Sequence, residues 1–341
     1  MQERFEDFSH ITPEIILSAV EKLDVKCTGR IIPLNSLENR VYEVELEVKD
    51  SSKIKSKYES SRVIKFYRPN RWTKDQILEE HKFIFDLKDQ EIPVVSPILF
   101  ENGQTLQTVN DATRDDQEIY FTVYPKVGGR IIDEFSDSQI ALLGRLIARM
   151  HLVARQEKTK HRLTLNPTTY GRDNLQYLIA NNILPNEITE RYSYLVNTIC
   201  DLTDSWLEGV SLQRVHGDFH IGNILWANEE CQLVDFDDFV MAPAIQDLWL
   251  IVSGRDEWNL KQREVLLNAY SSMINFDFDT IRLIEPFRAL RLINFTTWIA
   301  KRWEDTSFKN IFVDFNTPQY WRDQLISLEE VLQIMYSGEI L

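Results

Sequence analysis

A short segment of the chain, residues 216–238, restricts the possible folds more than any other. It reads His216-Gly-Asp-Phe-His-Ile-Gly-Asn-Ile-Leu-Trp226 and, after four further residues, Cys231-Gln-Leu-Val-Asp-Phe-Asp-Asp238. Two apolar runs, residues 224–226 and 232–234, flank a polar turn, which is typical of a small antiparallel hairpin. The sequence therefore predicts a short hairpin with polar residues at its open end.

This hairpin brings oxygen-bearing side chains together. We expect Trp226 to pair with Gln232, so that Asn223 lies opposite Asp235. Asp218, five residues before Asn223, lies in the loop that leads into the hairpin. Carboxylate and amide oxygens are the ligands that Mg²⁺ prefers, with phosphates in its other positions. We therefore predict a magnesium and phosphate site here; the alternative is a turn whose polar groups bond only to one another.

The first third of the chain is predicted to be rich in strands. Residues 41–48 alternate apolar and polar side chains, residues 62–67 form a second apolar run, and residues 119–124 form a third. Alternation with a period of two is the pattern of a half-buried strand. A capping box, Thr73 with Gln76, opens a helix that is expected to end near residue 87.

After residue 125 the pattern becomes helical. Residues 127–130, Val-Gly-Gly-Arg, are interpreted as a hinge, a second capping box begins at Ser136, and residues 171–206 and 257–336 have helical periodicity. A length of 341 residues suits two domains. We predict an α+β protein with a β-rich lobe, residues 1–125, and an α-helical lobe, residues 126–341.

Charge and composition exclude some functions. The net charge of −15 argues against nucleic acid as a partner, because phosphate backbones are bound through clustered Lys and Arg. The N-terminus lacks the pattern of a signal peptide, and no apolar run is long enough to span a membrane. Cys27, Cys200 and Cys231 are far apart and are expected to be reduced thiols in a cytoplasmic protein.

The spacing of Asp218, Asn223 and Asp235 resembles the catalytic loop and metal-binding Asp of protein kinases, in the branch of the aminoglycoside and choline kinases. The resemblance implies that Asp218 accepts the proton of the attacking hydroxyl. It also implies that Asn223 and Asp235 hold the magnesium ions that bridge the phosphates of ATP.

A kinase of this kind also needs a Lys on a strand and a Glu on the next helix. Lys65 lies in the Val-Ile-Lys-Phe run, which matches the kinase pattern. Of the two adjacent acids, Glu80 falls on the apolar stripe of Ile77 and Ile84, whereas Glu79 points towards solvent. Because an unpaired buried carboxylate is costly, we predict that Glu80 pairs with Lys65; a solvated helix face is the alternative.

The loop before the first predicted strand replaces a glycine-rich loop. Ser36, Asn39 and backbone N–H groups of residues 34–42 are candidates for covering the phosphates. A plain turn explains the same residues nearly as well.

The resemblance extends over nearly the whole chain, in blocks that are more specific than the catalytic loop. These blocks are residues 33–42, 63–69, 71–81, 127–130, 216–226, 243–249 and 284–291. They resemble the bacterial stress response kinase A family. Departures are Phe219 and Ile221 in the catalytic loop and a longer polar insertion at residues 49–61.

This resemblance implies a cytoplasmic serine/threonine protein kinase of a stress response, with a choline-kinase-like fold and autophosphorylation. It assigns the active site to Asp218 and Asp235, the magnesium ligands to Asn223 and Asp235, and the ATP-site serine to Ser36; Lys65 and Glu80 complete the ATP site. The expected partners are ATP, Mg²⁺ and proteins with Ser or Thr. We expect a monomer without a nucleic-acid or membrane partner.

Two further side chains in and near the catalytic loop have expected contacts. His220 stands where protein kinases usually place a Lys, so it either assists the γ-phosphate or bonds to backbone. Asp247, in an apolar run, is expected to brace the catalytic loop, because it would otherwise be buried without a partner.

The residues alone leave the acceptor open. A small alcohol, such as homoserine, choline or an antibiotic, suits the same fold, since no Ala-Pro-Glu segment closes an activation loop. A pseudokinase that binds nucleotide without turnover would lack a catalytic group, whereas Lys65, Asp218, Asn223 and Asp235 are all present.

Overall fold

The structure, a computed structural model, describes residues 8, 11–48, 56–110, 118–132, 134–227 and 230–338. Its chain forms two compact units. The first contains Met1–Asp133 and Ile221–Asp237, and the second contains Glu134–His220 and Asp238–Leu341. This division differs from two consecutive lobes, because the short segment Ile221–Asp237 belongs with the N-terminal part of the chain.

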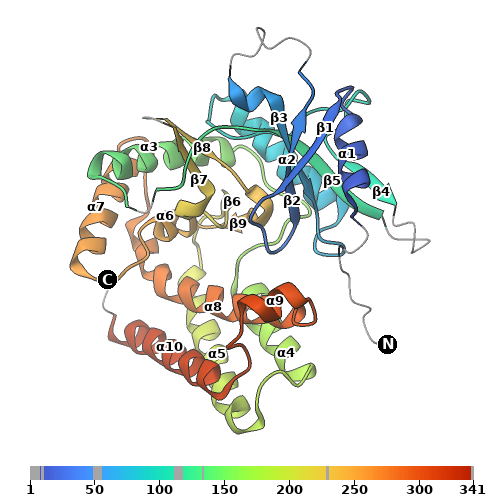
Figure 1. Cartoon of the computed structure of the whole chain (residues 1–341). Coiled ribbons are helices and arrows are strands. Elements are labelled where there is room, and N and C mark those ends of the chain that lie inside the picture. Colours follow the sequence, from blue (N-terminus) through green and yellow to red (C-terminus); the bar gives the residue numbers. More distant parts are fainter. Residues whose placement is uncertain are drawn as a thin grey trace. The chain divides into compact units, whose positions relative to one another are not determined.

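An antiparallel sheet of five strands forms the centre of the first unit (Figure 1). Its strands are β1 (Cys27–Pro33), β2 (Arg40–Leu46), β3 (Ser61–Phe66), β4 (Gln107–Asn110) and β5 (Glu118–Pro125), in the spatial order β1-β2-β3-β5-β4. Three of them, β2, β3 and β5, confirm the predicted strands. Residues 49–55 of the polar stretch between β2 and β3 lie outside the described residues.

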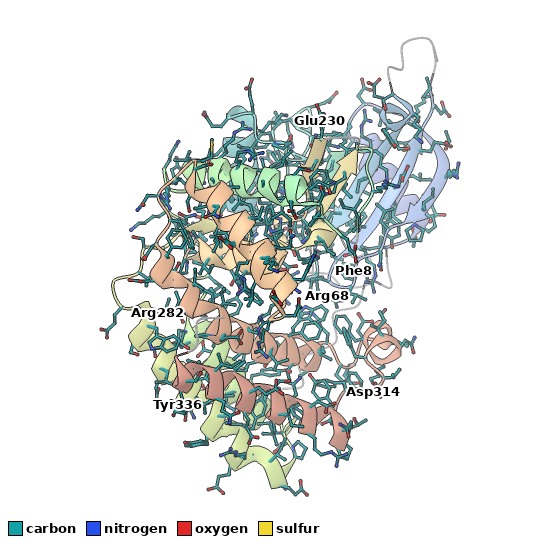
Figure 2. The ribbon with its side chains drawn as sticks, turned by 90° about the vertical axis from the view of Figure 1, so that its left-hand side faces the viewer. Phe8, Arg68, Glu230, Arg282, Asp314 and Tyr336 are labelled. Carbon is teal, nitrogen blue, oxygen red and sulfur yellow. The ribbon has the colours of Figure 1, made fainter. Side chains whose placement is uncertain are left out.

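One face of this sheet is buried by helix α1 (Pro13–Glu21), whose Ile16 and Val20 share a core cluster with Ile64 and Phe66. Phe8 belongs to the same cluster, and its ring lies 5.2 Å from the Arg68 guanidinium (Figure 2). Successive strand residues point to opposite faces. The side chain of Lys65, between Ile64 and Phe66, therefore points away from this cluster.

Helix α2 (Lys74–Asp89) begins as predicted. Thr73 accepts a hydrogen bond from the Gln76 N–H, and the Gln76 side chain accepts one from the Thr73 N–H, which completes the capping box. The buried face of α2 carries Ile77, Phe83 and Ile84, and it also carries Glu80. A carboxylate thus lies on the apolar side of the helix, as its spacing predicted.

The predicted hairpin is present as β7 (Ile224–Ala227) and β8 (Glu230–Leu233), but its register differs by one residue. Trp226 pairs with Cys231 and not with Gln232. Ala227 pairs with Glu230, so the connection is shorter than expected. A slip of one residue reverses every side-chain direction, and Asn223 consequently lies opposite Val234 and not opposite Asp235.

Backbone hydrogen bonds join this hairpin to the rest of the first unit. The N–H of Leu233 donates to the Pro93 carbonyl (2.7 Å), and Arg130 and Trp226 exchange two hydrogen bonds of 2.9 Å. The stretch 127–130, interpreted as a hinge, therefore lies within the first unit, and the chain passes to the second unit after residue 133.

The second unit is mainly helical. Its helices are α3 (Asp137–Ala154), α4 (Asp173–Ala180), α5 (Asn186–Leu207), α6 (Ile245–Ile251), α7 (Glu257–Ser271), α8 (Ile284–Lys301), α9 (Thr306–Ile311) and α10 (Pro318–Ser337). Helices α5, α8 and α10 pack side by side (Figures 1 and 2), and α3 packs on α7. None of the helices in the described ranges is long and apolar enough to cross a bilayer.

A sheet of two short strands, β6 (Gln213–Val215) and β9 (Val240–Ala242), completes the second unit. The capping box at Ser136 opens α3 as predicted. A β-rich unit and a helical unit together confirm the α+β class.

Candidate active site

Lys65 is the centre of a charged cluster in the first unit. Its Nζ lies 3.1 Å from Asp237 Oδ1, 3.3 Å from Asp235 Oδ1 and 3.9 Å from Glu80 Oε1. Burial opposes the charge of this ammonium, but Asp237, Glu80 and Asp235 outweigh that effect and hold the pKa of Lys65 well above its usual value. The lysine therefore stays charged, and the expected ion pair with Glu80 forms.

Asp237 connects this cluster to the loop between β1 and β2. Its Oδ2 accepts hydrogen bonds from Arg71 Nη1 (2.5 Å) and from Asn39 Nδ2 (3.1 Å). The Asn39 Oδ1 accepts a bond from the N–H of Arg68 (3.1 Å), while the Arg68 guanidinium pairs with the Glu38 carboxylate. The loop thus ends in a buried network of charged and amide groups.

This network changes the interpretation of the loop. The Asn39 side chain, one of the two candidates for covering phosphates, is bonded inside the protein to Asp237 and Arg68. Ser36 lies half-buried in the same loop, residues 34–39. We therefore keep Ser36 and the backbone of this loop as candidates and withdraw Asn39.

Asn223 and Asp235 are neighbours in the first unit. Asn223 ends the 3₁₀ helix η4 (Ile221–Asn223), and its carbonyl accepts a bond from the N–H of Val234 (3.1 Å), the residue before Asp235. Asp235 has a φ of 62°, uncommon for a residue other than glycine. The Asp235 side chain is 56% exposed, so its carboxylate is accessible even though Lys65 is nearby.

These donors fit a hard divalent cation that also binds phosphate. Among the described residues no three His, Cys, Asp or Glu side chains are arranged as a metal site. One carboxylate and one amide instead leave positions for phosphate oxygens and water, the usual arrangement for Mg²⁺. Glu80, Asp235 and Asp237 also outnumber Lys65 and Arg71, and this negative charge favours a cation.

The proposed catalytic base, Asp218, lies in the second unit. Its Oδ1 is 2.7 Å from the Arg291 guanidinium, and its Oδ2 is 3.2 Å from Nε2 of His220. Burial alone would favour the neutral acid, but the His220 hydrogen bond and the Arg291 charge outweigh it, so the pKa of Asp218 lies well below its usual value. His220 thus contacts the carboxylate of Asp218, a contact that the sequence did not suggest.

Asp247 braces the loop before Asp218, as predicted. Its Oδ2 accepts a bond from the His216 N–H (2.8 Å) and its Oδ1 one from the Gly217 N–H (2.9 Å). His151 on α3 lies 3.0 Å from Oδ2 of Asp247, and the Gln246 side chain donates to the Gly217 carbonyl (2.9 Å). The loop is therefore held at three backbone atoms by the start of α6.

Gly217 is required at this position. Its φ is +84°, and a Cβ atom there would lie 2.2 Å from the carbonyl oxygen of Asp238. Left-handed backbone and a close backbone neighbour together exclude a side chain.

Three residues that form ion pairs in this site were not predicted from the sequence: Arg71, Asp237 and Arg291. Asp237 follows Asp235 by two residues, and both arginines lie in blocks that carry the family resemblance. Motif spacing marks such residues as candidates, but only tertiary contacts identify their partners. The five candidates Ser36, Lys65, Glu80, Asn223 and Asp235 lie in the first unit, and Asp218 lies in the second.

Comparison with known proteins identifies the family of the chain. Residues 30–284 match the family described as "Phosphotransferase enzyme family". This match covers more than half of the chain, so the chain belongs to that family.

Relatives place it more narrowly, in the family of stress response kinase A. The chain is 35% identical over 329 residues to "Stress response kinase A" of Shigella flexneri, covering 96% of this chain and 94% of the relative. It is 33% identical over 330 residues to "Serine/threonine protein kinase RdoA" of Salmonella typhimurium (strain LT2), covering 96% and 95%.

Solved structures share the fold. Amicoumacin kinase in complex with AMP-PNP, Ca²⁺ and Ami has a TM-score of 0.71 at 20% identity, covering 93% of this chain and 92% of its own. Choline kinase from Cryptosporidium parvum has a TM-score of 0.60 at 14% identity, covering 97% and 98%. At these identities the likeness shows the choline-kinase-like fold alone.

Proposed function

We propose that this protein is a serine/threonine protein kinase that transfers the γ-phosphate of Mg·ATP to protein hydroxyls, its own included, during a stress response. The observation that carries the proposal is the buried ammonium of Lys65 among the carboxylates of Glu80, Asp235 and Asp237. The protein acceptor is supported by the relative described as a serine/threonine protein kinase. A cytoplasmic location and a monomeric state belong to the same proposal.

Each residue has a distinct role in the proposed reaction. Lys65 binds phosphate oxygens, and Glu80 and Asp237 hold its ammonium in place. Ser36 and the backbone of its loop cover the phosphates. Asn223 and Asp235 would hold Mg²⁺, which neutralises phosphate charge when bound. Asp218 orients the acceptor hydroxyl and takes its proton.

A small-molecule acceptor is the second candidate. It is favoured by the solved structures of similar fold, which include kinases of amicoumacin, spectinomycin and choline. Both candidates use the same residues on ATP and differ only in the acceptor.

Incubation with Mg·ATP labelled at the γ-phosphate tests both candidates. We expect label in protein, with phosphorylated Ser or Thr located by mass spectrometry, and none in a panel of choline, homoserine and aminoglycosides. Asp218→Asn should lower the rate at least about 100-fold. Asp323→Asn, on the exposed face of α10, is the matched control and should keep the rate. Label confined to metabolites would select the second candidate, and unchanged transfer by Asp218→Asn would contradict the assigned base.

A further inference from the structure

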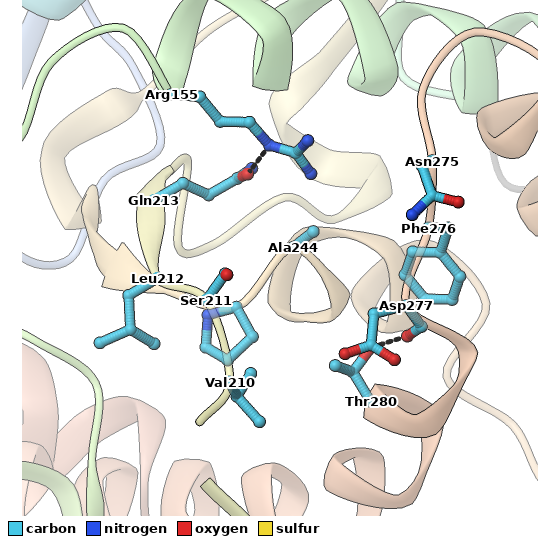
Figure 3. Close-up of a pocket in the computed structure, with 11 residues that line it drawn as sticks. Arg155, Val210, Ser211, Leu212, Gln213, Ala244, Asn275, Phe276, Asp277 and Thr280 are labelled. Carbon is cyan, nitrogen blue, oxygen red and sulfur yellow. Dashed lines mark hydrogen bonds between the residues drawn. The ribbon is translucent and has the colours of Figure 1, made fainter. Parts of the chain in front are cut away.

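The second unit contains a cavity next to the elements that hold the catalytic loop. Its volume is about 360 Å³, at the small end of the range for pockets that bind small molecules. Eleven residues line it, all of them in the second unit, and Figure 3 shows ten of them labelled. None of the residues assigned to the phosphoryl transfer lines this cavity.

The walls of the cavity adjoin the elements that hold the catalytic loop. Gln213 begins β6, and β6 ends at Val215, directly before His216 and Gly217. Pro243 and Ala244 lie directly before α6, which carries Asp247. The cavity and the catalytic loop thus lie at opposite ends of the β6–β9 sheet, about 10 Å apart at the usual rise of a strand.

A third connection runs through α3 and α7. Arg155, which caps the C-terminus of α3, follows His151 by one helical turn. His151 Nδ1 lies 3.0 Å from the hydroxyl of Tyr270, and its Nε2 lies 3.0 Å from Asp247. Burial raises the pKa of Tyr270, and the neighbouring Arg155 guanidinium opposes that rise. Arg155 is therefore linked through Tyr270 and His151 to Asp247, the residue that braces Gly217.

The lining has one cation and one carboxylate. Arg155 donates from Nε to the Gln213 side chain (2.6 Å), which orients its guanidinium, and Asp277 lies on the opposite wall (Figure 3). Asp277 Oδ1 caps the 3₁₀ helix η6 (Phe278–Leu283) by accepting from the Asp279 N–H. Val210, Phe276 and Ala244 supply apolar surface to the lining.

We propose that this cavity binds a small zwitterion with an apolar side chain, an α-amino acid or a dipeptide, and that its occupancy adjusts the catalytic loop. The carboxylate of the ligand pairs with Arg155 and its ammonium with Asp277. A sphere of this volume is about 9 Å across, and two extended residues span about 7 Å, so both ligand sizes fit. The effect on the loop rests on the proposed kinase function; the binding does not.

Calorimetric titration of the full chain tests the binding. The probes are L-leucine and L-alanyl-L-leucine, each beside its N-acetyl form, which lacks the ammonium, and its amide, which lacks the carboxylate. We expect a dissociation constant of about 0.1–1 mM for at least one zwitterion and binding at least tenfold weaker for its capped forms. The relative affinities of the two zwitterions identify which source is preferred. Equal binding of capped and uncapped forms, or no binding, would overturn the site.

Variants separate the two charges. Arg155→Gln should weaken zwitterion binding at least tenfold. Asp277→Asn, which keeps the helix cap, should do the same for the zwitterion and should leave binding of the N-acetyl form unchanged. Arg145→Gln on the exposed face of α3 and Asp279→Asn are controls outside the cavity and should bind as the natural protein does. Melting temperatures identify any variant that has lost its fold, and binding unaffected in both folded cavity variants contradicts the proposal.

Hydrogen exchange tests the coupling without reference to activity. The amides of His216 and Gly217 bond to Asp247, so a bound zwitterion should change their exchange rates, and the rate of autophosphorylation should change with them. Exchange at both amides that is insensitive to a bound ligand would overturn the coupling. A chain that binds the zwitterion and alters its exchange but transfers no phosphate would refute the proposed function and leave the site standing.

Discussion

Arg291 contacts the carboxylate that we assign as the catalytic base and, together with the His220 hydrogen bond, lowers the pKa of that carboxyl. The guanidinium favours the ionised form of Asp218 and so lowers its pKa. In Arg291→Gln this pKa rises, Asp218 becomes protonated at a higher pH, and the acid limb of the pH profile of kcat/KM should move to higher pH. The matched control is Arg191→Gln, which removes an ion pair of the same length, 2.7 Å, at an exposed site. Identical acid limbs in the two variants would contradict the assignment.

Asp237 pairs with two cations at once, the buried Lys65 and the half-buried Arg71. Lys65 keeps Glu80 and Asp235 as partners when Asp237 is neutralised, but the charge-assisted bonds of Asp237 are weakened. Asp237→Asn should therefore lower the free energy of unfolding by about 2 kcal/mol. It should also raise KM for ATP, because the Lys65 ammonium loses its nearest carboxylate. Asp86→Asn breaks an exposed pair with Lys82 and should change stability by less than about 0.5 kcal/mol in urea unfolding. Equal stability changes in both variants would show that the network contributes nothing.

At the scale of elements, the catalytic loop depends on backbone packing between two short segments. Gly217 and Gly209 both have positive φ, but only Gly217 would place a Cβ against other atoms. Gly209→Ala should therefore cost about 1 kcal/mol, the penalty of the left-handed conformation. Gly217→Ala should cost at least about 2 kcal/mol more and abolish phosphoryl transfer, because the loop must move away from Asp238. Thermal unfolding and the labelled-ATP assay measure both effects, and equal costs would contradict this account of the loop.

The starts of two helices were predicted from the sequence, whereas the register of the hairpin was not. The two capping boxes placed the starts of α2 and α3 correctly, because a cap is a local interaction within four residues. The hairpin β7–β8 was predicted, but its register was not. Register depends on the length of the turn and on the strands' neighbours, here Arg130 and Pro93, which lie far away in the sequence.

At the scale of the whole molecule, the three cysteine thiols are distributed over both units, so their reactivity can be used to follow the unfolding of each unit. Cys27 and Cys231 belong to the first unit and Cys200 to the second, and burial raises their pKa to about 11, 11 and 12. At pH 8 the native thiols should react with iodoacetamide more slowly than in the unfolded chain, where the pKa is about 8.5. The expected factor is about two orders of magnitude for Cys27 and Cys231 and about three for Cys200. Peptide mapping during a urea titration then shows whether the units unfold together. Fast labelling of Cys200 or Cys231 in the native protein would contradict the burial of these two thiols.

The class of fold was predicted correctly from the sequence, and the same local patterns supplied the candidate site residues on which the proposed chemistry rests. Periodicity, caps and motif spacing are local properties, and they were sufficient to propose Lys65, Glu80, Asn223, Asp235 and Asp218 as candidates. Glu80 could be chosen over Glu79 because a helix exposes one face and buries the other.

The contacts that hold these residues depend on the tertiary structure. Asp237 joins Lys65, Arg71 and Asn39, which lie more than 160 residues before it, and Arg291 lies more than 70 residues after the Asp218 that it contacts. The assignment of Ile221–Asp237 to the first unit likewise follows from contacts in space. Electrostatic and packing energies depend on distance in space, and a linear pattern of residue types does not contain those distances.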